Sequence, residues 1–288
     1  MGKLLDKINY PSDLRQLSVD ELPALCDELR EDIVNELAVN PGHLASSLGA
    51  LEFTVALHYV YNTPEDRIVW DVGHQAYGHK ILTGRRDEFH TNRKLGGIKP
   101  FPSPDESIYD AFVAGHASSS VSIALGMARA RTLQNEKYEV AALIGDGAAT
   151  GGIAYEGLND AAVSKEPIVV ILNDNELSID RNVGGMAFHL RKLRTKERYL
   201  GMKQRSRKFL NKIPGGDFLY NCIHKTKDKL RRMLIPTTIF ENMGFTYLGP
   251  VDGHDTEHLI FLLQRLHRDQ RRKFDFTVFV NVISNHKR

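Results

Sequence analysis

Apolar residues near the start of the chain recur with the spacing of a helix. Ser18 and Glu21 stand at the positions of an N-terminal capping box, and leucine or isoleucine then returns every three or four residues as far as Ile33. Asn40-Pro41-Gly42 is a combination that ends helices. The pattern predicts one helix up to that point and a second over residues 48–61.

Four later runs of apolar, β-branched residues have the length of strands, at residues 67–72, 139–144, 167–172 and 274–283. Each of the first three runs is continuous rather than alternating, which is typical of parallel strands covered by helices on both faces. Helical segments at residues 117–133 and 151–164 separate the first three runs, and a capped helix opens at 255–260. These repeated units predict an α/β fold, with one parallel sheet flanked by helices and right-handed crossovers.

The composition of the 288 residues is that of an ordinary globular protein, with 42% hydrophobic residues, 26% charged residues and a net charge of +2. Cys26 and Cys222 match neither a metal-binding spacing nor a disulfide framework, which favours free thiols in a reducing cytosol. The N-terminus has no signal-peptide pattern, and no run approaches the ~20 apolar residues of a membrane span. We therefore expect a cytoplasmic protein with no membrane partner.

Residues 191–232 form a strongly basic stretch, with fifteen Lys or Arg against three acidic residues. Clustered cations are the usual footprint of nucleic-acid binding. The nearly neutral whole chain, and the scarcity of aromatic residues that could stack on bases, instead favour a solvated, mobile insertion over about residues 184–238 of a single domain. We expect no nucleic-acid partner, and a basic insertion would attract anionic substrates.

Two short polar motifs follow the second and third predicted strands. Gly145-Asp146-Gly147 and Asn173-Asp174-Asn175 place Asp146 and Asn175 29 residues apart, about one strand–helix–strand unit. If these strands are neighbours, both motifs lie at the carboxyl edge of the sheet, where open α/β sheets bind ligands. Because Mg²⁺ prefers hard oxygen ligands, the Asp146 carboxylate, the Asn175 amide and the Leu177 carbonyl form a candidate metal site.

A diphosphate would complete such a site. The glycines beside Asp146 allow the backbone to approach phosphates closely, and the following helix would direct its N-terminal N–H groups at them. Each motif alone is more often an ordinary turn. Because both occur, each after a buried strand and at this separation, we favour a magnesium-diphosphate site over two unrelated turns.

The same residues resemble a known family. Gly-Asp-Gly followed by asparagine at this distance is the signature of thiamine-diphosphate enzymes, and the surrounding sequence is similar to the N-terminal region of the 1-deoxy-D-xylulose-5-phosphate synthase family, within the transketolase superfamily. Transketolases themselves match less well. The blocks that carry the resemblance, between about residues 10 and 260, include GHLASSLGALEFTVALHYVYNTPEDRIVWDVGHQAYGHKILTGRRDEF, KLGGIKPFPSPDESIYDAFVAGHASSS, LIGDGAATGGIAYEGLN, ILNDNELSI and YLGPVDGHD.

The resemblance implies a set of site residues. Those expected to hold Mg²⁺ are Asp146, Asn175 and the carbonyl of Leu177. Those expected to line thiamine diphosphate are His74, Gly115, His116, Ala117, Ser118, Gly147, Ala148 and Asn175. Those expected to assist proton transfers at the reacting end are His43 and His74.

Histidines near glycine-rich turns are candidates for proton transfer even without the resemblance, because imidazole is the side chain best suited to this role near neutral pH. A single loop histidine is nevertheless more often a surface residue. We assign His79 to that class and His58, on an apolar helical stripe, to packing. His254 stays open between orienting a loop and capping the following helix together with Asp255.

The resemblance also implies a reaction and partners. It implies the decarboxylative condensation of pyruvate with glyceraldehyde 3-phosphate, a first step in isoprenoid synthesis that also supplies precursor for thiamine and pyridoxal. No pyrimidine-binding domain, C-terminal domain or activating glutamate is recognisable in these residues, so a homodimer or a heteromer with a pyrimidine-domain chain is expected. The alternatives are a split transketolase-like subunit and a catalytically incomplete cofactor-binding fragment.

Overall fold

The computed structural model describes residues 3–164, 166–175, 184–185, 188, 239–271 and 277–284. Contacts divide the chain into one unit of Met1–Asn182 with Phe245–Arg288 and a second unit of Val183–Gly244. In the second unit the described helix is α10 (Ile239–Met243). The basic stretch at 191–232 and Leu177 lie outside the described residues, so their predicted roles stay predictions.

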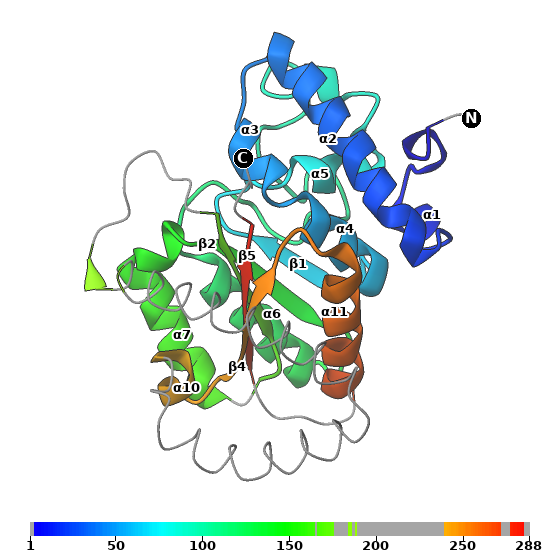
Figure 1. The fold of residues 1–288 in the computed structure, drawn as a ribbon. Coiled ribbons are helices and arrows are strands. Elements are labelled where there is room, and N and C mark those ends of the chain that lie inside the picture. The colour runs from blue at the N-terminus through cyan, green and yellow to red at the C-terminus, as the bar shows by residue number, and fades with distance from the viewer. Residues whose placement is uncertain are drawn as a thin grey trace, which may run out of the picture. The chain divides into compact units, whose positions relative to one another are not determined.

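The first unit is built on a sheet of five parallel strands in the order β1-β2-β3-β5-β4 (Figure 1). Its strands are β1 (Arg67–Trp70), β2 (Val140–Gly145), β3 (Val169–Asp174), β4 (Thr246–Asp252) and β5 (Val278–Ile283). The four predicted runs correspond to β1, β2, β3 and β5. The predicted α/β class and its parallel sheet are therefore confirmed.

β4 is a strand that the sequence pattern did not predict. Gly249 and Pro250 interrupt its apolar run, and its pairing with β5 shifts register between Leu248 and Val251. Proline lacks the N–H that a ladder needs, so sheets tolerate it mainly on edge strands. β4 lies at the end of the strand order, where this interruption is least costly.

Helices precede the sheet and connect its strands. Those of the first unit are α1 (Pro11–Leu14), α2 (Leu22–Val39), α3 (Leu44–Leu48), α4 (Leu51–Val60), α5 (Tyr77–Lys80), α6 (Ser120–Leu133), α7 (Gly152–Ser164) and α11 (Thr256–Arg271). Short turns of tighter or wider helix are η1 (Leu5–Lys7), η2 (Val19–Glu21), η3 (Ile81–Arg85), η4 (Phe89–Thr91) and η5 (Ala148–Thr150). The predicted capping box is present, since the Ser18 N–H donates to the Glu21 carboxylate.

Both faces of the sheet are buried, as the continuous apolar runs predicted. On one face, strand residues such as Leu143, Ile171 and Val280 share one apolar cluster with α2, α4 and α11. Successive strand residues point to opposite faces. Ala142 and Val170 are accordingly buried on the other face, where α6 packs with α7 beside it (Figure 1).

The long helix α2 buries the predicted apolar stripe, whose members are Leu22, Leu25, Leu29 and Ile33. Within the part of the chain that the structure describes, no helix combines the length and the apolarity that a membrane crossing requires.

Asp66 aligns the starts of β1 and β2. Its buried carboxylate accepts hydrogen bonds from the backbone N–H of Glu139, at 2.8 Å, and of Asn62, at 2.7 Å. The Arg67 N–H donates to the carbonyl of Glu139 in the adjoining step of the ladder. One side chain thus fixes the amino-terminal ends of both strands.

Asp66→Ala is expected to lower the free energy of unfolding by about 1–3 kcal/mol, because two backbone donors lose their acceptor and one of them is fully buried. Urea unfolding followed by circular dichroism measures the change. The control Asp20→Ala removes an exposed aspartate and should stay within about 0.5 kcal/mol of the parent chain. Equal unfolding midpoints for the two variants would contradict this role of Asp66.

Candidate active site at the carboxyl edge of the sheet

The two polar motifs end neighbouring strands. β2 and β3 pair in parallel with Gly145 opposite Asn173, and the Asp146 N–H donates to the Asn173 carbonyl at 3.1 Å. The pairing therefore continues one residue beyond β2. Asp146 and Asn175 are both buried at this edge, with 4% and 7% of their surfaces exposed.

Asn173 ties three segments together at the same edge. Its amide nitrogen donates to Gln75 Oε1 at 2.7 Å, and its amide oxygen accepts a hydrogen bond from the Ser284 hydroxyl. Gln75 lies in the turn after β1, and Ser284 follows β5. A Cβ on Gly49, at the end of α3, would come within 3.3 Å of Ser284 Oγ and 3.7 Å of the Asn175 Cβ. The end of α3 therefore lies at the same edge of the sheet.

The segment before α6 is bound directly to the turn after β2. The Ser118 hydroxyl donates to the Ala148 carbonyl at 2.7 Å, and a Cβ on Gly151 would approach that hydroxyl to 2.2 Å. Ser118 has a φ of 72°, and its N–H donates to Asp71 Oδ1 at 2.8 Å. The Ser120 N–H donates to the other oxygen of Asp71 at 3.1 Å. Asp71 therefore fixes the start of α6 against the end of β1.

The remaining predicted residues of these segments lie at the solvent side of the edge. Gly147 and Ala148 are half-buried, while Gly115, His116 and Ala117 are exposed. Gly115 has a φ of 143°, a backbone conformation that favours glycine. These residues are therefore more accessible to a bound molecule than the buried Asp146 and Asn175.

His43 and His74 form a pair. His43 immediately precedes α3, and His74 lies in the turn after β1. Their ring centroids are 5.7 Å apart in an edge-on arrangement. The Ser47 hydroxyl donates to the His74 carbonyl at 2.9 Å, and the His43 N–H donates to the Tyr77 hydroxyl at 3.3 Å. Local hydrogen bonds from α3 and α5 therefore hold both backbones.

The surroundings keep both imidazoles neutral at pH 7. Burial, and then the neighbouring His43, lower the pKa of His74 to about 4. Burial, and then Arg93, lower the pKa of His43. The buried Nδ1 of His74 has no hydrogen-bond partner among the described residues. This nitrogen therefore has a hydrogen-bonding capacity that the described residues do not use.

The donor set fits a magnesium diphosphate. Among the described residues, no group of three or more His, Cys, Asp or Glu gathers around one point. A magnesium site with one carboxylate, one amide and one backbone carbonyl does not require such a group, since Mg²⁺ usually combines one or two carboxylates with phosphates and water. Asp146 and Asn175 supply oxygens of this kind beside a glycine-rich turn.

Two of the other histidines are now placed. The expectation of a surface position for His79 is wrong, because its side chain is fully buried between His58 Nε2, at 2.9 Å, and Asp110 Oδ1, at 2.7 Å. No local pattern indicates a partner that lies 31 residues away. The predicted packing position of His58 agrees with its complete burial.

His254 pairs with a glutamate rather than capping a helix. Its Nδ1 lies 3.4 Å from the buried Glu52 of α4, which raises the pKa of the imidazole. The following residue, Asp255, accepts the His258 N–H at 3.0 Å within the first turn of α11. Of the two interpretations left open, Asp255 takes the capping role and His254 connects the β4–α11 turn to α4.

Comparison with known proteins decides the family. The family model described as 1-deoxy-D-xylulose-5-phosphate synthase matches residues 5–283. The chain belongs to the 1-deoxy-D-xylulose-5-phosphate synthase family. A synthase of this name from Bacteroides fragilis is 55% identical over 263 residues, which are 90% of this chain and 41% of that protein. The synthase from Carboxydothermus hydrogenoformans is 47% identical over 99% of this chain and 45% of its own length. The chain thus spans somewhat less than half of these synthases.

Solved structures support the fold. A transketolase from Campylobacter jejuni superposes with a TM-score of 0.61 over 93% of this chain and 38% of its own, at 17% identity. The transketolase from Leishmania mexicana gives the same TM-score at 16% identity. The synthase family and transketolases therefore share this parallel sheet with flanking helices.

The site of this synthase-family chain includes residues that the sequence analysis missed. These are Ser47, Asp71, Gln75, Phe101, Asn173 and Ser284. A local signal existed for Asp71, which lies near the end of the predicted strand run 67–72, and for Asn173, which opens the asparagine-rich motif. The others act through contacts between distant segments, which leave no pattern along the chain.

His74→Gln is expected to make stability less sensitive to acid. The folded-state pKa of about 4 lies below the ordinary value of 6.5, so the unfolded chain binds a proton in this interval that the folded chain does not. The contribution of neutral His74 to the free energy of unfolding is fully present above pH 6.5 and is lost as the pH falls toward 4. Urea unfolding at pH 7 and pH 4.5 should show a loss that is roughly 1–2 kcal/mol smaller in His74→Gln than in the parent chain.

The control for this measurement is His258→Gln, which replaces an exposed histidine of α11. It should lose the same stability as the parent chain between the two pH values. An identical loss in His74→Gln would contradict the neutral, desolvated state that we assign to His74.

Proposed function

We propose that this chain is the cofactor-binding N-terminal part of a 1-deoxy-D-xylulose-5-phosphate synthase. In this proposal it binds Mg²⁺ and the diphosphate of thiamine diphosphate, and it serves the decarboxylative condensation of pyruvate with glyceraldehyde 3-phosphate. When bound, thiamine diphosphate supplies the chemistry of decarboxylation and carbon–carbon bond formation, while the protein binds and orients it.

One observation carries the proposal. Asp146 and Asn175 are buried at the ends of two neighbouring, in-register strands, beside a glycine-rich turn at the carboxyl edge of a parallel sheet. This edge is where open α/β sheets bind ligands. An acid and an amide held there have the oxygen chemistry that Mg²⁺ prefers. The carbonyl of Leu177, two residues beyond Asn175, is proposed as the third protein ligand.

The segments around the metal ligands are proposed to hold the diphosphate. Gly147 and Ala148 lie between Asp146 and α7, and the Ala148 carbonyl is bound by Ser118. The residues proposed to complete the cofactor-binding surface are Gly115, His116, Ala117, Ser118 and His74. Helix N-termini and glycine-rich turns present N–H groups to phosphates, which supports this arrangement.

The histidine pair is proposed to serve the reacting end. A neutral imidazole can accept a proton and return it near pH 7. His74 Nδ1, which is buried and has no partner among the described residues, is proposed to contact the cofactor. His43, which is exposed, is proposed to exchange a proton with the carbonyl oxygen of the substrate.

A second surface is proposed to complete the site, either from a second copy of the full-length protein or from a separate pyrimidine-domain chain. Several large apolar side chains next to the site motifs are exposed, namely Leu44, Phe112, Val113 and Ile153. Exposed apolar surface near a site is typical of an interface. The chain covers 41–45% of the length of related synthases, so the rest of the machinery is expected on other residues.

Asp146→Asn is expected to weaken binding of thiamine diphosphate in the presence of Mg²⁺ by at least about tenfold, because a neutral amide replaces the one carboxylate proposed for the metal. Isothermal titration calorimetry measures this, with the chain alone and after mixing with a pyrimidine-domain partner. The control Asp160→Asn changes an exposed aspartate that pairs with Arg129, and it should bind like the parent chain.

Two results would count against the proposal. Equal affinities of Asp146→Asn and Asp160→Asn would remove Asp146 from the metal site. Failure of the parent chain to bind the cofactor even with a partner present would remove the cofactor-binding function. If the cofactor binds, turnover of xylulose 5-phosphate in place of pyruvate as the donor would identify a split transketolase instead.

A further inference from the structure

A long loop packs beside the histidine pair. Residues 92–119, between η4 and α6, contain no helix or strand. Loops of this length without secondary structure are uncommon in compact domains and are usually functional. Backbone turns hold parts of this loop, including a hydrogen bond from the Ala114 N–H to the Pro102 carbonyl at 3.1 Å, and side chains anchor it to the rest of the chain.

One end of the 92–119 loop packs on the histidines. The Phe101 ring stacks on His43 with centroids 6.2 Å apart and planes inclined by 24°. Phe101, Pro102 and Ala114 also surround Gly73, where an added Cβ would lie 2.7 Å from Pro102. Gly73 directly precedes His74, so the loop packs beside the residue before one histidine and on the ring of the other.

A buried carboxylate fixes this end of the loop. Asp110 is 2% exposed and accepts the Ser103 N–H at 2.8 Å, two residues beyond Phe101. It also accepts two hydrogen bonds from Arg85, at 2.6 and 2.9 Å, and one from His79 Nε2, at 2.7 Å. The loop is thereby connected to α5 and η3.

The hydrogen bonds around Asp110 require one arrangement of protons. His79 Nε2 donates to the carboxylate, so in the neutral ring Nδ1 is an acceptor. His58 Nε2 must then donate to His79 Nδ1, and His58 Nδ1 accepts from the Thr63 hydroxyl, at 3.0 Å. Burial lowers the pKa of both rings, which agrees with two neutral histidines.

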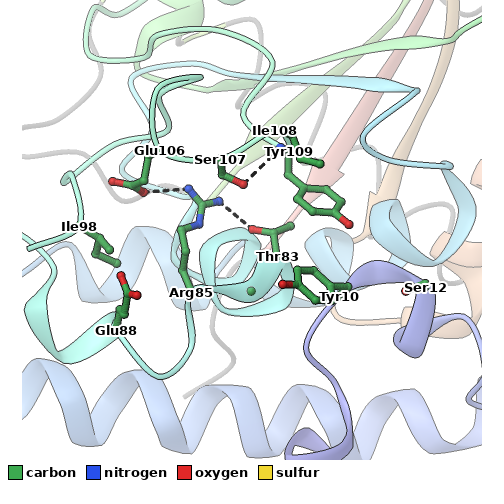
Figure 2. Close-up of a pocket in the computed structure, with 11 residues that line it drawn as sticks. Tyr10, Ser12, Thr83, Arg85, Glu88, Ile98, Glu106, Ser107, Ile108 and Tyr109 are labelled. Atoms are coloured by element: carbon green, nitrogen blue, oxygen red, sulfur yellow. Dashed lines mark hydrogen bonds and ion pairs between the residues drawn. The ribbon is translucent and has the colours of Figure 1, made fainter.

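A second carboxylate anchors the loop nearer to solvent. Glu106 accepts a hydrogen bond from Arg85 at 2.9 Å (Figure 2). It also accepts hydrogen bonds from Lys80, at 2.6 Å, and from the Lys99 N–H. Arg85 and Glu106 border a cavity of about 530 Å³ that is also lined by Tyr10 and Tyr109. The side chain of Glu106 is 12% exposed, whereas that of Asp110 is fully buried.

We propose that Asp110 is a positioning residue for the histidine pair, which holds the 92–119 loop so that Phe101 stays on His43. Replacing a buried ion pair by apolar residues is often neutral for stability, so such a network is weak support for a purely stabilising role. Its direct geometric consequence is the placement of Ser103 and hence of Phe101. This inference does not depend on the cofactor assignment, because it concerns residues of this chain alone.

The test is the titration of His43 in the full chain. Asp110→Asn removes a negative charge, which through space would disfavour the imidazolium and lower the pKa of His43. Release of Phe101 acts in the opposite direction, because burial lowers this pKa and exposure restores it toward 6.5. The other charged or titratable groups that act on His43 are His74 and Arg93, which keep their side chains in this variant. Arg93 belongs to the 92–119 loop, so its displacement on release of the loop would also raise the His43 pKa.

We expect the His43 pKa to rise in Asp110→Asn, measured by NMR on chain labelled with ¹³C at histidine Cε1 and assigned with His43→Gln. Phe101→Ala should raise it as well, and adding Asp110→Asn to Phe101→Ala should produce no further rise. The control Asp105→Asn, an exposed aspartate of the same loop, should leave the His43 pKa at its parent value.

Glu106→Gln provides a second route to the same answer if Asp110→Asn does not fold. It loosens the other anchor of the loop with a smaller burial cost, and it should raise the His43 pKa and speed amide exchange over residues 99–110. An unchanged or lowered His43 pKa in folded Asp110→Asn, or in Glu106→Gln with faster loop exchange, would overturn the proposal. Failure of cofactor binding would not, since no cofactor enters the measurement.

Discussion

The in-register pairing of β2 with β3 is the constraint on which the candidate site depends. A shift of one residue in a strand exchanges its two faces. Here the two faces of these strands pack against different helices, so a shift would misplace the core side chains on both faces. The Asp146 N–H continues the ladder beyond β2 by binding the Asn173 carbonyl. The position of the candidate ligands is therefore set by the core rather than by a flexible loop.

Around that pair, the site is held by polar side chains that bind backbone of other segments. Asp71 accepts N–H groups at the start of α6, and Asn173 connects the turn after β1 with the end of β5. Asp110 does the same for the 92–119 loop. Each of these groups is almost completely buried, where hydrogen bonds are strongest and an unsatisfied partner is most costly. The edge of the sheet is therefore held by side-chain hydrogen bonds between segments as well as by the backbone hydrogen bonds of the strands.

The sequence predicted the parts of the structure that leave a local pattern. Apolar runs predicted β1, β2, β3 and β5, because a strand buried on both faces is built mostly of apolar residues. β4 escaped prediction because Gly249 and Pro250 interrupt its run. The surface position expected for His79 rested on the general behaviour of loop histidines, and its buried partner Asp110 lies 31 residues away. Gln75 was overlooked because its partner lies 98 residues away. Contacts of this kind are set by tertiary structure and have no period along the chain.

The interrupted edge strand has a consequence for assembly. An exposed, regular edge offers unpaired N–H and C=O groups to strands of other molecules and promotes aggregation. In the part of the chain that the structure describes, one edge is β4, broken at Pro250, and the other is β1, only four residues long. Neither edge is a good template for an additional strand. Any contact that this sheet makes with another molecule is therefore more easily built from side chains than from an added strand.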